Sequence, residues 1–284
     1  MSDWIIPVSW SENASDALSP ATANAAYAAL REQGVAILRG IFAGSEAEVL
    51  HREYLSQYGA FDLGQMSELA ARPPPSPLIE VGEARYDITV RMKGAFASPR
   101  LIANVLLRRF LAPLLGDNMR LNSFTVVASY PGAHLQHPHR DHGHLYADLP
   151  TDPPLPAHAI NVAVPLIDVP VETEPTGIWL GSHKWPESYI PPPEAMTTVA
   201  FQRGDCILVD YRTLHTGLPN RSAQIRPIIY MTYARTWFFD ECNHLGRNPL
   251  NMPLQTYEAL PESVRPLLFR VFLQSVRRRQ LAEV

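Results

Sequence analysis

Residues 204–217 read Gly-Asp-Cys-Ile-Leu-Val-Asp-Tyr-Arg-Thr-Leu-His-Thr-Gly. A glycine turn precedes an apolar run of strand length, and His215 follows shortly after that run. A strand of this kind delivers the side chain that comes after it to the mouth of a small β-barrel. We therefore expect this half of the chain to form such a barrel, with His215 at its open end.

Segments with strand character surround this stretch. From about residue 121 they alternate with Pro, Gly and Asn, and we expect strands at 123–130, 159–167, 177–180, 197–201, 206–210 and 226–234. Short strands at this spacing are typical of a sandwich or a jelly-roll barrel, the architecture that includes cupins. The sequence predicts a mainly β fold with flanking helices and a barrel core over about 121–240.

The first part of the chain, about 1–120, is expected to be largely helical. Helices are predicted from Pro20 to Gln33, from Ser45 to Tyr58 and from Ser98-Pro99 to Leu115, a strand at 35–38, and a C-terminal helix at about 261–280. The chain shows no internal repeat and no clear domain boundary. We therefore expect residues 1–284 to form a single domain.

Composition narrows the class of protein. A hydrophobic fraction of 46% and a charged fraction of 18% suit a globule with a sizeable core, and a net charge of −4 gives no electrostatic case for nucleic-acid binding. Cys206 and Cys242 are too few for a disulfide framework and fit a reducing compartment. The sequence has no basic and apolar leader and no apolar run of about 18 residues. We expect a cytoplasmic protein without a membrane partner. The sequence does not indicate an oligomeric state.

Residues 134–144 hold five of the ten histidines and the only His-x-Asp motif, His139-Arg-Asp141. On a strand end, positions i and i+2 point to the same side, so His139 and Asp141 can face one metal ion. A polar loop that tolerates histidines, or a tract that binds metal non-specifically, is the alternative. The remaining histidines of this run have no acid two residues on, and are interpreted as loop or pocket residues: His134, His137, His142 and His144.

A third ligand must come from a distant strand. His158 lies in a Pro-rich loop and His183 lies in an expected turn, Gly-Ser-His-Lys, whereas His215 follows an apolar strand. A lone histidine after a strand is more often structural, but Arg226 lies eleven residues beyond His215 and favours a site there. Two histidines and one carboxylate are the ligand set of mononuclear non-haem Fe(II) oxygenases.

Three motifs in this order resemble the phytanoyl-CoA dioxygenase family. They are Gln136-x-x-His139-x-Asp141, residues 174–184 (Glu-Pro-Thr-Gly-Ile-Trp-Leu-Gly-Ser-His-Lys) and residues 204–222, and the resemblance covers about 121–236. It implies a double-stranded β-helix and dependence on Fe(II), 2-oxoglutarate and O₂. It also implies that His183 belongs to a structural turn. Related halogenases carry a small residue in place of Asp141, so this aspartate argues against halogenation.

The cosubstrate needs a cation for its far carboxylate. Arginine binds carboxylates through two parallel bonds and stays charged when partly buried, and Arg226 has the spacing at which the family places this cation. Thr176 and Gln136 resemble the hydroxyl and the amide that assist cosubstrate binding. Arg91 or Lys93 could reach the pocket from the N-terminal half, or both could lie on a solvated strand face.

The resemblance implies an oxidation coupled to conversion of 2-oxoglutarate to succinate and CO₂. Hydroxylation of an unactivated C–H in a small metabolite, such as a natural-product intermediate, is the expected outcome, and the family also desaturates, epoxidises and rearranges rings. Two alternatives remain: a cupin-type dioxygenase or isomerase that does not use 2-oxoglutarate, and a non-catalytic ligand-binding member of the fold. Residues 60–97 and 142–158 are the expected lid segments because they are Pro-rich and lack periodicity.

Overall fold

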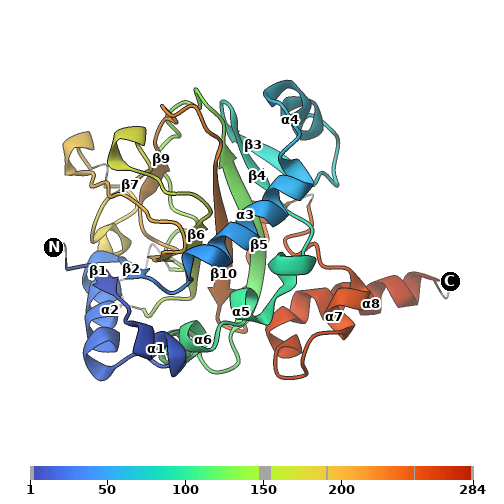
Figure 1. Ribbon diagram of the computed structural model, residues 1–284, viewed down its shortest axis with the longest axis horizontal. Helices are drawn as coiled ribbons and strands as arrows, with labels where there is room; N and C mark the ends of the chain where they lie inside the picture. The colour runs from blue at the N-terminus through green and yellow to red at the C-terminus, as the bar shows by residue number, and fades with distance from the viewer. Residues whose placement is uncertain (1–2, 147–154, 190, 246, 283–284) are drawn as a thin grey trace.

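An eight-stranded sheet forms the centre of the computed structural model, which describes residues 3–146, 155–189, 191–245 and 247–282 (Figure 1). In spatial order its strands are β1 (Ile5–Pro7), β2 (Val35–Arg39), β8 (Cys206–Asp210), β6 (Ala159–Pro165), β10 (Arg226–Ala234), β5 (Arg120–Ser129), β4 (Arg85–Ile88) and β3 (Leu78–Gly82). A second sheet pairs β7 (Thr176–Ile178) with β9 (His215–Gly217). Neighbouring strands are antiparallel except β1 and β2, which are parallel.

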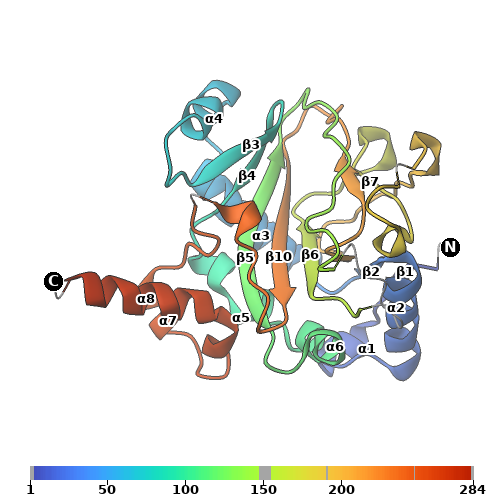
Figure 2. The ribbon, with the colours of Figure 1, turned by 180° about the vertical axis from the view of Figure 1, so that it is seen from behind.

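Eight α-helices in the described part of the chain flank the large sheet. They are α1 (Trp10–Ala14), α2 (Pro20–Gln33), α3 (Gly44–Tyr58), α4 (Leu63–Ala70), α5 (Pro99–Ile102), α6 (Val105–Leu115), α7 (Leu254–Glu258) and α8 (Phe269–Ala282). Helix α3 crosses the sheet in Figure 1 and lies behind it in Figure 2, where the loops near β7 come forward. Every residue of β6 is buried, because this central strand is covered on both faces. Within the described residues, no helix is long and apolar enough to cross a membrane.

The observed elements differ from the sequence predictions in several places. The helix predicted from Ser98-Pro99 to Leu115 is two helices, because Asn104 accepts a hydrogen bond from the Leu107 N–H and caps a new start. The segment 197–201 forms only isolated bridges, through Thr197 and Phe201. The C-terminal α-helix begins at Phe269, after a 3-10 turn at Arg265–Leu268. Strands β1, β3 and β4 and helices α1 and α4 were not predicted.

Residues 60–97, one of the two expected lid segments, form regular secondary structure. They contain α4, the β3–β4 hairpin and a 3-10 turn at Gly94–Ala97, and β4 pairs with β5 inside the large sheet. The other expected lid, 142–158, lies partly outside the described residues. The N-terminal part of the chain thus contributes four strands to the large sheet and is not merely a helical layer.

Gly34 ends α2 with a left-handed backbone (φ +75°), and its carbonyl accepts hydrogen bonds from the Asp210 N–H and the Thr213 hydroxyl. A Cβ at this position would collide with the Thr213 hydroxyl and the His183 ring. We expect Gly34→Ala to lower the free energy of unfolding by about 1–3 kcal/mol, the usual cost of a strained backbone. Urea denaturation measures this difference.

Gly44→Ala is the matched control for Gly34→Ala. Gly44 is the first residue of α3, and an added Cβ would meet nothing within 4 Å. Alanine is the better helix former, so we expect unchanged or slightly raised stability. Equal urea midpoints for the two variants would show that a side chain at Gly34 does not strain the end of α2.

Candidate metal centre

His139 and His215 lie opposite each other at the end of the small sheet. Each backbone N–H donates to the carbonyl of the other at 2.9 Å, so their side chains point to the same side. The two ring centroids are 4.4 Å apart. Asp141, two residues after His139, faces the same space, and one ligand atom from each of the three residues lies within 4.8 Å of the others. The structure thus brings together the three residues singled out in the sequence.

Backbone carbonyls set the orientation of both imidazoles. His139 Nδ1 lies 3.0 Å from the carbonyl of His137, and His215 Nδ1 lies 3.0 Å from the carbonyl of Thr213. Because a carbonyl oxygen only accepts, each Nδ1 carries the proton and each Nε2 keeps its lone pair. His215 Nε2 lies 3.7 Å from Asp141 Oδ1. Two imidazole nitrogens and one carboxylate oxygen therefore face one point, a donor set that fits a divalent transition metal.

Burial prepares His139 for this role. Removal from water, followed by the neighbouring His215, lowers the pKa of His139 to about 4. The imidazole is therefore neutral at physiological pH and does not need to lose a proton before it binds a metal.

Two buried arginines lie at the end of β9, the strand that begins with His215. Arg226 opens β10 and Arg85 opens β4, and both pair with Ser129 of the intervening strand β5, so both face the same side of the sheet. Arg226 is 2% exposed and Arg85 is 3% exposed. Both guanidiniums donate to the Leu218 carbonyl, at 2.9 Å and 2.7 Å respectively.

Backbone carbonyls supply the other hydrogen bonds that these arginines make within the described residues. Arg226 donates to Thr173 and Glu174 at 3.1 and 2.6 Å, and Arg85 donates to His134 at 3.0 Å. Arg85 Nε has no partner there. Burial first, and the charge of Arg85 second, lower the pKa of Arg226 to about 10, which leaves it charged at neutral pH. Among the described residues neither cation bonds to a carboxylate, so the pair would attract an anion.

A cavity extends from the metal-binding side chains along β10. Its walls are Asp141, Asn161, Ala163, Thr176, Ile178, Phe201, Ile207, Val209, His215, Ile228 and Tyr230. Thr176 is part of this lining, and its role in cosubstrate binding stays a prediction. Tyr230 is a residue that the sequence interpretation missed. Because strand side chains alternate, Tyr230 shares the face of Arg226, and burial raises its pKa to about 12, so the phenol is neutral.

Gln136 lies next to the arginines, outside this cavity. Its side-chain oxygen accepts a hydrogen bond from the Gly217 N–H at 3.3 Å. A Cβ on Gly217 would collide with the Arg85 guanidinium and approach Gln136 Oε1 to 2.9 Å. Glycine at this position therefore leaves room for the buried cation.

The other candidates from the sequence lie elsewhere. Arg91 and Lys93 are exposed and lie outside any strand, so the strand face proposed for them does not exist. His183 is buried in a 3-10 turn, with Nε2 3.1 Å from the Arg31 carbonyl, away from the metal-binding atoms. His158 is buried against Phe238, at 4.5 Å between ring centroids.

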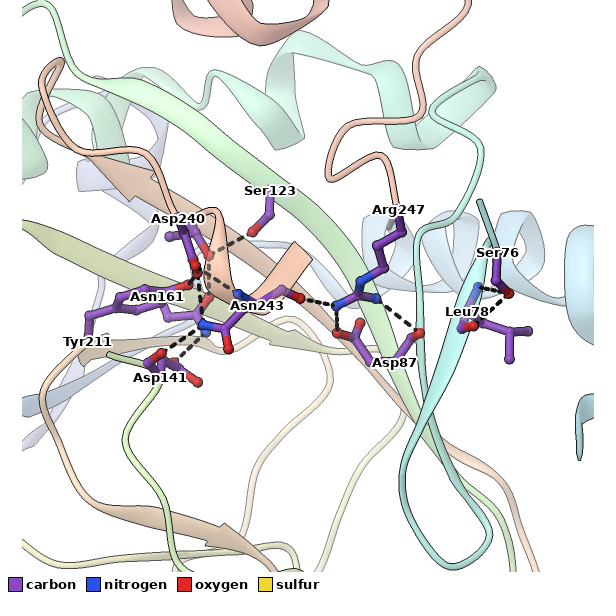
Figure 3. A network of polar contacts seen from close by, with 11 residues as sticks. Ser76, Leu78, Asp87, Ser123, Asp141, Asn161, Tyr211, Asp240, Asn243 and Arg247 are labelled. Atoms are coloured by element: carbon purple, nitrogen blue, oxygen red, sulfur yellow. Dashed lines mark hydrogen bonds and ion pairs between the residues drawn. The ribbon is translucent and has the colours of Figure 1, made fainter. Parts of the chain in front are cut away.

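Two asparagines hold Asp141 from different directions (Figure 3). Asn161 of β6 donates to Asp141 Oδ2 at 3.0 Å, and Asn243, in the 3-10 turn Cys242–His244, donates to the Asp141 carbonyl at 2.7 Å. The same Asn243 amide donates to Asp240, which also accepts a hydrogen bond from the Tyr211 hydroxyl at 2.6 Å. No local sequence pattern predicts either asparagine, because both contact Asp141 from strands or turns that are distant in the chain.

Known proteins share this fold. HygX from Streptomyces hygroscopicus, solved with nickel and 2-oxoglutarate bound, superposes with a TM-score of 0.58 at 15% identity, over 79% of this chain and 90% of that one. A second HygX structure also holds hygromycin B. EctD from S. alaskensis, solved with 2-oxoglutarate and 5-hydroxyectoine, gives 0.56 at 19% identity, over 77% and 76% of the two chains. The predicted jelly-roll fold, mainly β with flanking helices, is confirmed.

Sequence comparison identifies the family. The dioxygenase andF of Emericella variicolor is 32% identical over 127 residues, which are 43% of this chain and 43% of that protein, so the match spans less than half the length of the relative. The family model described as phytanoyl-CoA dioxygenase (PhyH) matches residues 30–228, and so begins well before the region in which we recognised its motifs. Because this match covers more than half of the sequence, the chain belongs to the phytanoyl-CoA dioxygenase family.

Proposed function

We propose that this protein is an Fe(II)- and 2-oxoglutarate-dependent dioxygenase that oxidises a small metabolite, with hydroxylation of an unactivated C–H as its outcome. The observation that carries this proposal is the position of the two buried arginines. Arg226 and Arg85 provide positive charge without a bonded carboxylate, on the sheet face that leads along β10 toward His139, Asp141 and His215.

The residues divide the work between metal and cosubstrate. His139, Asp141 and His215 would hold the iron, which, with 2-oxoglutarate and O₂, supplies an oxidation that yields succinate and CO₂. Arg226 anchors the far carboxylate of 2-oxoglutarate, and Arg85 adds a second positive charge beside it. The apolar cavity walls exclude water from the cosubstrate.

Thr176 and Tyr230 line the proposed cosubstrate pocket, and Gln136 supports it from outside. The Thr176 hydroxyl and the neutral Tyr230 phenol provide hydrogen bonds inside the cavity. Gln136 fixes the strand β9 next to Arg85 through its bond to the Gly217 N–H. Thr176 and Tyr230 therefore shape the space between the metal and the arginines, and Gln136 acts only through β9.

The arginine pair also weighs against the alternatives. A cupin-type enzyme that uses no 2-oxoglutarate does not require buried cations at this position, and a non-catalytic member of the fold does not need three converging metal-binding side chains. A small-molecule substrate is supported by HygX and EctD, whose structures hold hygromycin B and 5-hydroxyectoine. We also propose that residues 1–284 act as one domain, because β1–β4 join the barrel sheet, and that the protein is cytoplasmic, because Cys206 and Cys242 are unpaired.

Anaerobic titration of the protein with Fe(II) and 2-oxoglutarate tests the proposal. We expect a visible charge-transfer band that requires both components and is lost in His215→Ala. On admission of O₂, we expect succinate to form. Metal binding without the band would favour a cupin-type enzyme, and no metal binding would favour the non-catalytic alternative.

A further inference from the structure

The two carboxylate oxygens of Asp141 have different surroundings. Oδ1 is the oxygen near His215 Nε2, at 3.7 Å, whereas Oδ2 accepts a hydrogen bond from the Asn161 side chain at 3.0 Å. One oxygen therefore faces the metal-binding nitrogens, and the other is engaged by the protein. We infer that Asn161 is a positioning residue that restricts Asp141 to one-oxygen coordination of the metal, an inference that rests on the proposed function.

A row of polar side chains across three strands fixes the direction of the Asn161 amide. Thr232 of β10 pairs with Asn161 of β6 on one side and with Ser123 of β5 on the other. The Ser123 hydroxyl donates to the Thr232 hydroxyl at 2.8 Å, and the Thr232 hydroxyl donates to Asn161 Oδ1 at 3.5 Å. Because Oδ1 accepts from Thr232, the Asn161 NH₂ group must point toward Asp141.

Folding alone does not account for this row. Ser123, Thr232 and Asn161 are 4%, 2% and 8% exposed, in a sheet whose other buried positions are mostly apolar. Burying polar groups stabilises a protein little even when they are fully paired, and packed apolar side chains at the same positions would serve the fold as well. We therefore interpret the row as a support that holds the Asp141 carboxylate at its end.

One-oxygen coordination preserves a position on the metal. Two imidazoles and one carboxylate oxygen leave three of six positions open, as in other sites with this ligand set. A chelating cosubstrate would need two of them, and O₂ would need the third. If Asp141 bound through both oxygens, it would compete for one of these positions, so the hydrogen bond from Asn161 keeps the site open.

Replacement of Asn161 tests this role with Co(II), which needs no turnover. We expect Asn161→Ala to bind Co(II) about 10- to 100-fold more weakly, the usual effect of losing a residue that orients a metal ligand. At saturating Co(II), we also expect weaker binding of 2-oxoglutarate and an altered visible spectrum of the Co(II) protein. Isothermal titration calorimetry and absorption spectroscopy measure these changes.

Asn122→Ala is the matched control, because Asn122 is fully buried in β5 and donates to the Phe238 carbonyl instead of to Asp141. We expect it to bind Co(II) and 2-oxoglutarate as the wild type does. Thr232→Val removes the hydroxyl that orients Asn161, and it should weaken the binding of Co(II) and of 2-oxoglutarate, as Asn161→Ala does. This second variant keeps the test available if Asn161→Ala does not fold.

The inference and the proposed function fail in different ways. If the wild-type protein binds Co(II) and 2-oxoglutarate, and a folded Asn161→Ala or Thr232→Val variant binds 2-oxoglutarate with wild-type affinity and an unchanged Co(II) spectrum, the positioning role is wrong. If the wild-type protein binds neither ligand, the proposed function itself is wrong.

Discussion

Replacing Asp141 with alanine should abolish succinate formation and weaken Fe(II) binding by more than about 100-fold, beyond the effect of losing a residue that only orients a ligand. The Asp141 carboxylate supplies the negative charge among the three converging side chains. Burial holds His139 neutral, so this imidazole adds no charge to the site. Without the carboxylate, a divalent cation would sit in a partly buried site beside two neutral imidazoles, with no opposing charge among the metal-binding groups. Calorimetric titration with Fe(II) under anaerobic conditions measures the affinity.

Asp168→Ala provides the control for the Asp141 variant. Asp168 is also an aspartate, but its side chain is 66% exposed and lies against Arg203 on the surface. Its loss should leave metal affinity and succinate formation unchanged. Wild-type affinity in Asp141→Ala would show that this carboxylate is not a metal ligand.

Replacing Arg226 with alanine should chiefly weaken cosubstrate binding. Removing one partner of a desolvated charge pair costs about 2–5 kcal/mol, which corresponds to roughly a 30-fold to several-thousand-fold higher dissociation constant for 2-oxoglutarate. Arg85 remains in the variant and favours the lower part of this range. Titration of the charge-transfer band with 2-oxoglutarate measures the constant.

Two comparisons separate anchoring from a general loss of structure. Fe(II) affinity without cosubstrate should be unchanged in Arg226→Ala, because the guanidinium bonds to backbone carbonyls and to none of the three proposed ligands in the described part of the chain. Arg235→Ala removes another arginine that donates to carbonyls, those of Ala157 and Leu114, and should bind 2-oxoglutarate normally. Normal 2-oxoglutarate affinity in Arg226→Ala would refute the anchor role.

The sequence could predict the residues that are close together in the chain or tied to a strand end. His139 and Asp141 share a side because side chains on an extended segment repeat every two residues, and His215 follows an apolar strand that was predicted at its observed bounds, 206–210. Arg226 opens the last barrel strand, also at the predicted bounds of 226–234. These inferences needed only local periodicity and the resemblance to a family.

The site residues that the sequence did not predict owe their positions to the pairing between strands. Arg85 lies in β4, a strand of four residues that forms a hairpin with β3, and the local sequence pattern did not predict it. Even with β4 known, only its register against β5 and β10 places Arg85 next to Arg226. Tyr230 could have been found from alternation along β10, whereas Asn161 could not, because its partner Asp141 belongs to a loop.

The three proposed ligands do not come from one layer of the protein. His215 belongs to the small sheet, and His139 extends it, whereas the Asp141 carboxylate is tied to the large sheet through Asn161. An ion bound by these side chains would link the two sheets. The small sheet would gain most from this link, because each of its strands is only three residues long. Loading with metal should then slow amide hydrogen exchange in β7 and β9 more than in β5 or β10, so the supply of metal would govern the lifetime of the fold as well as its activity.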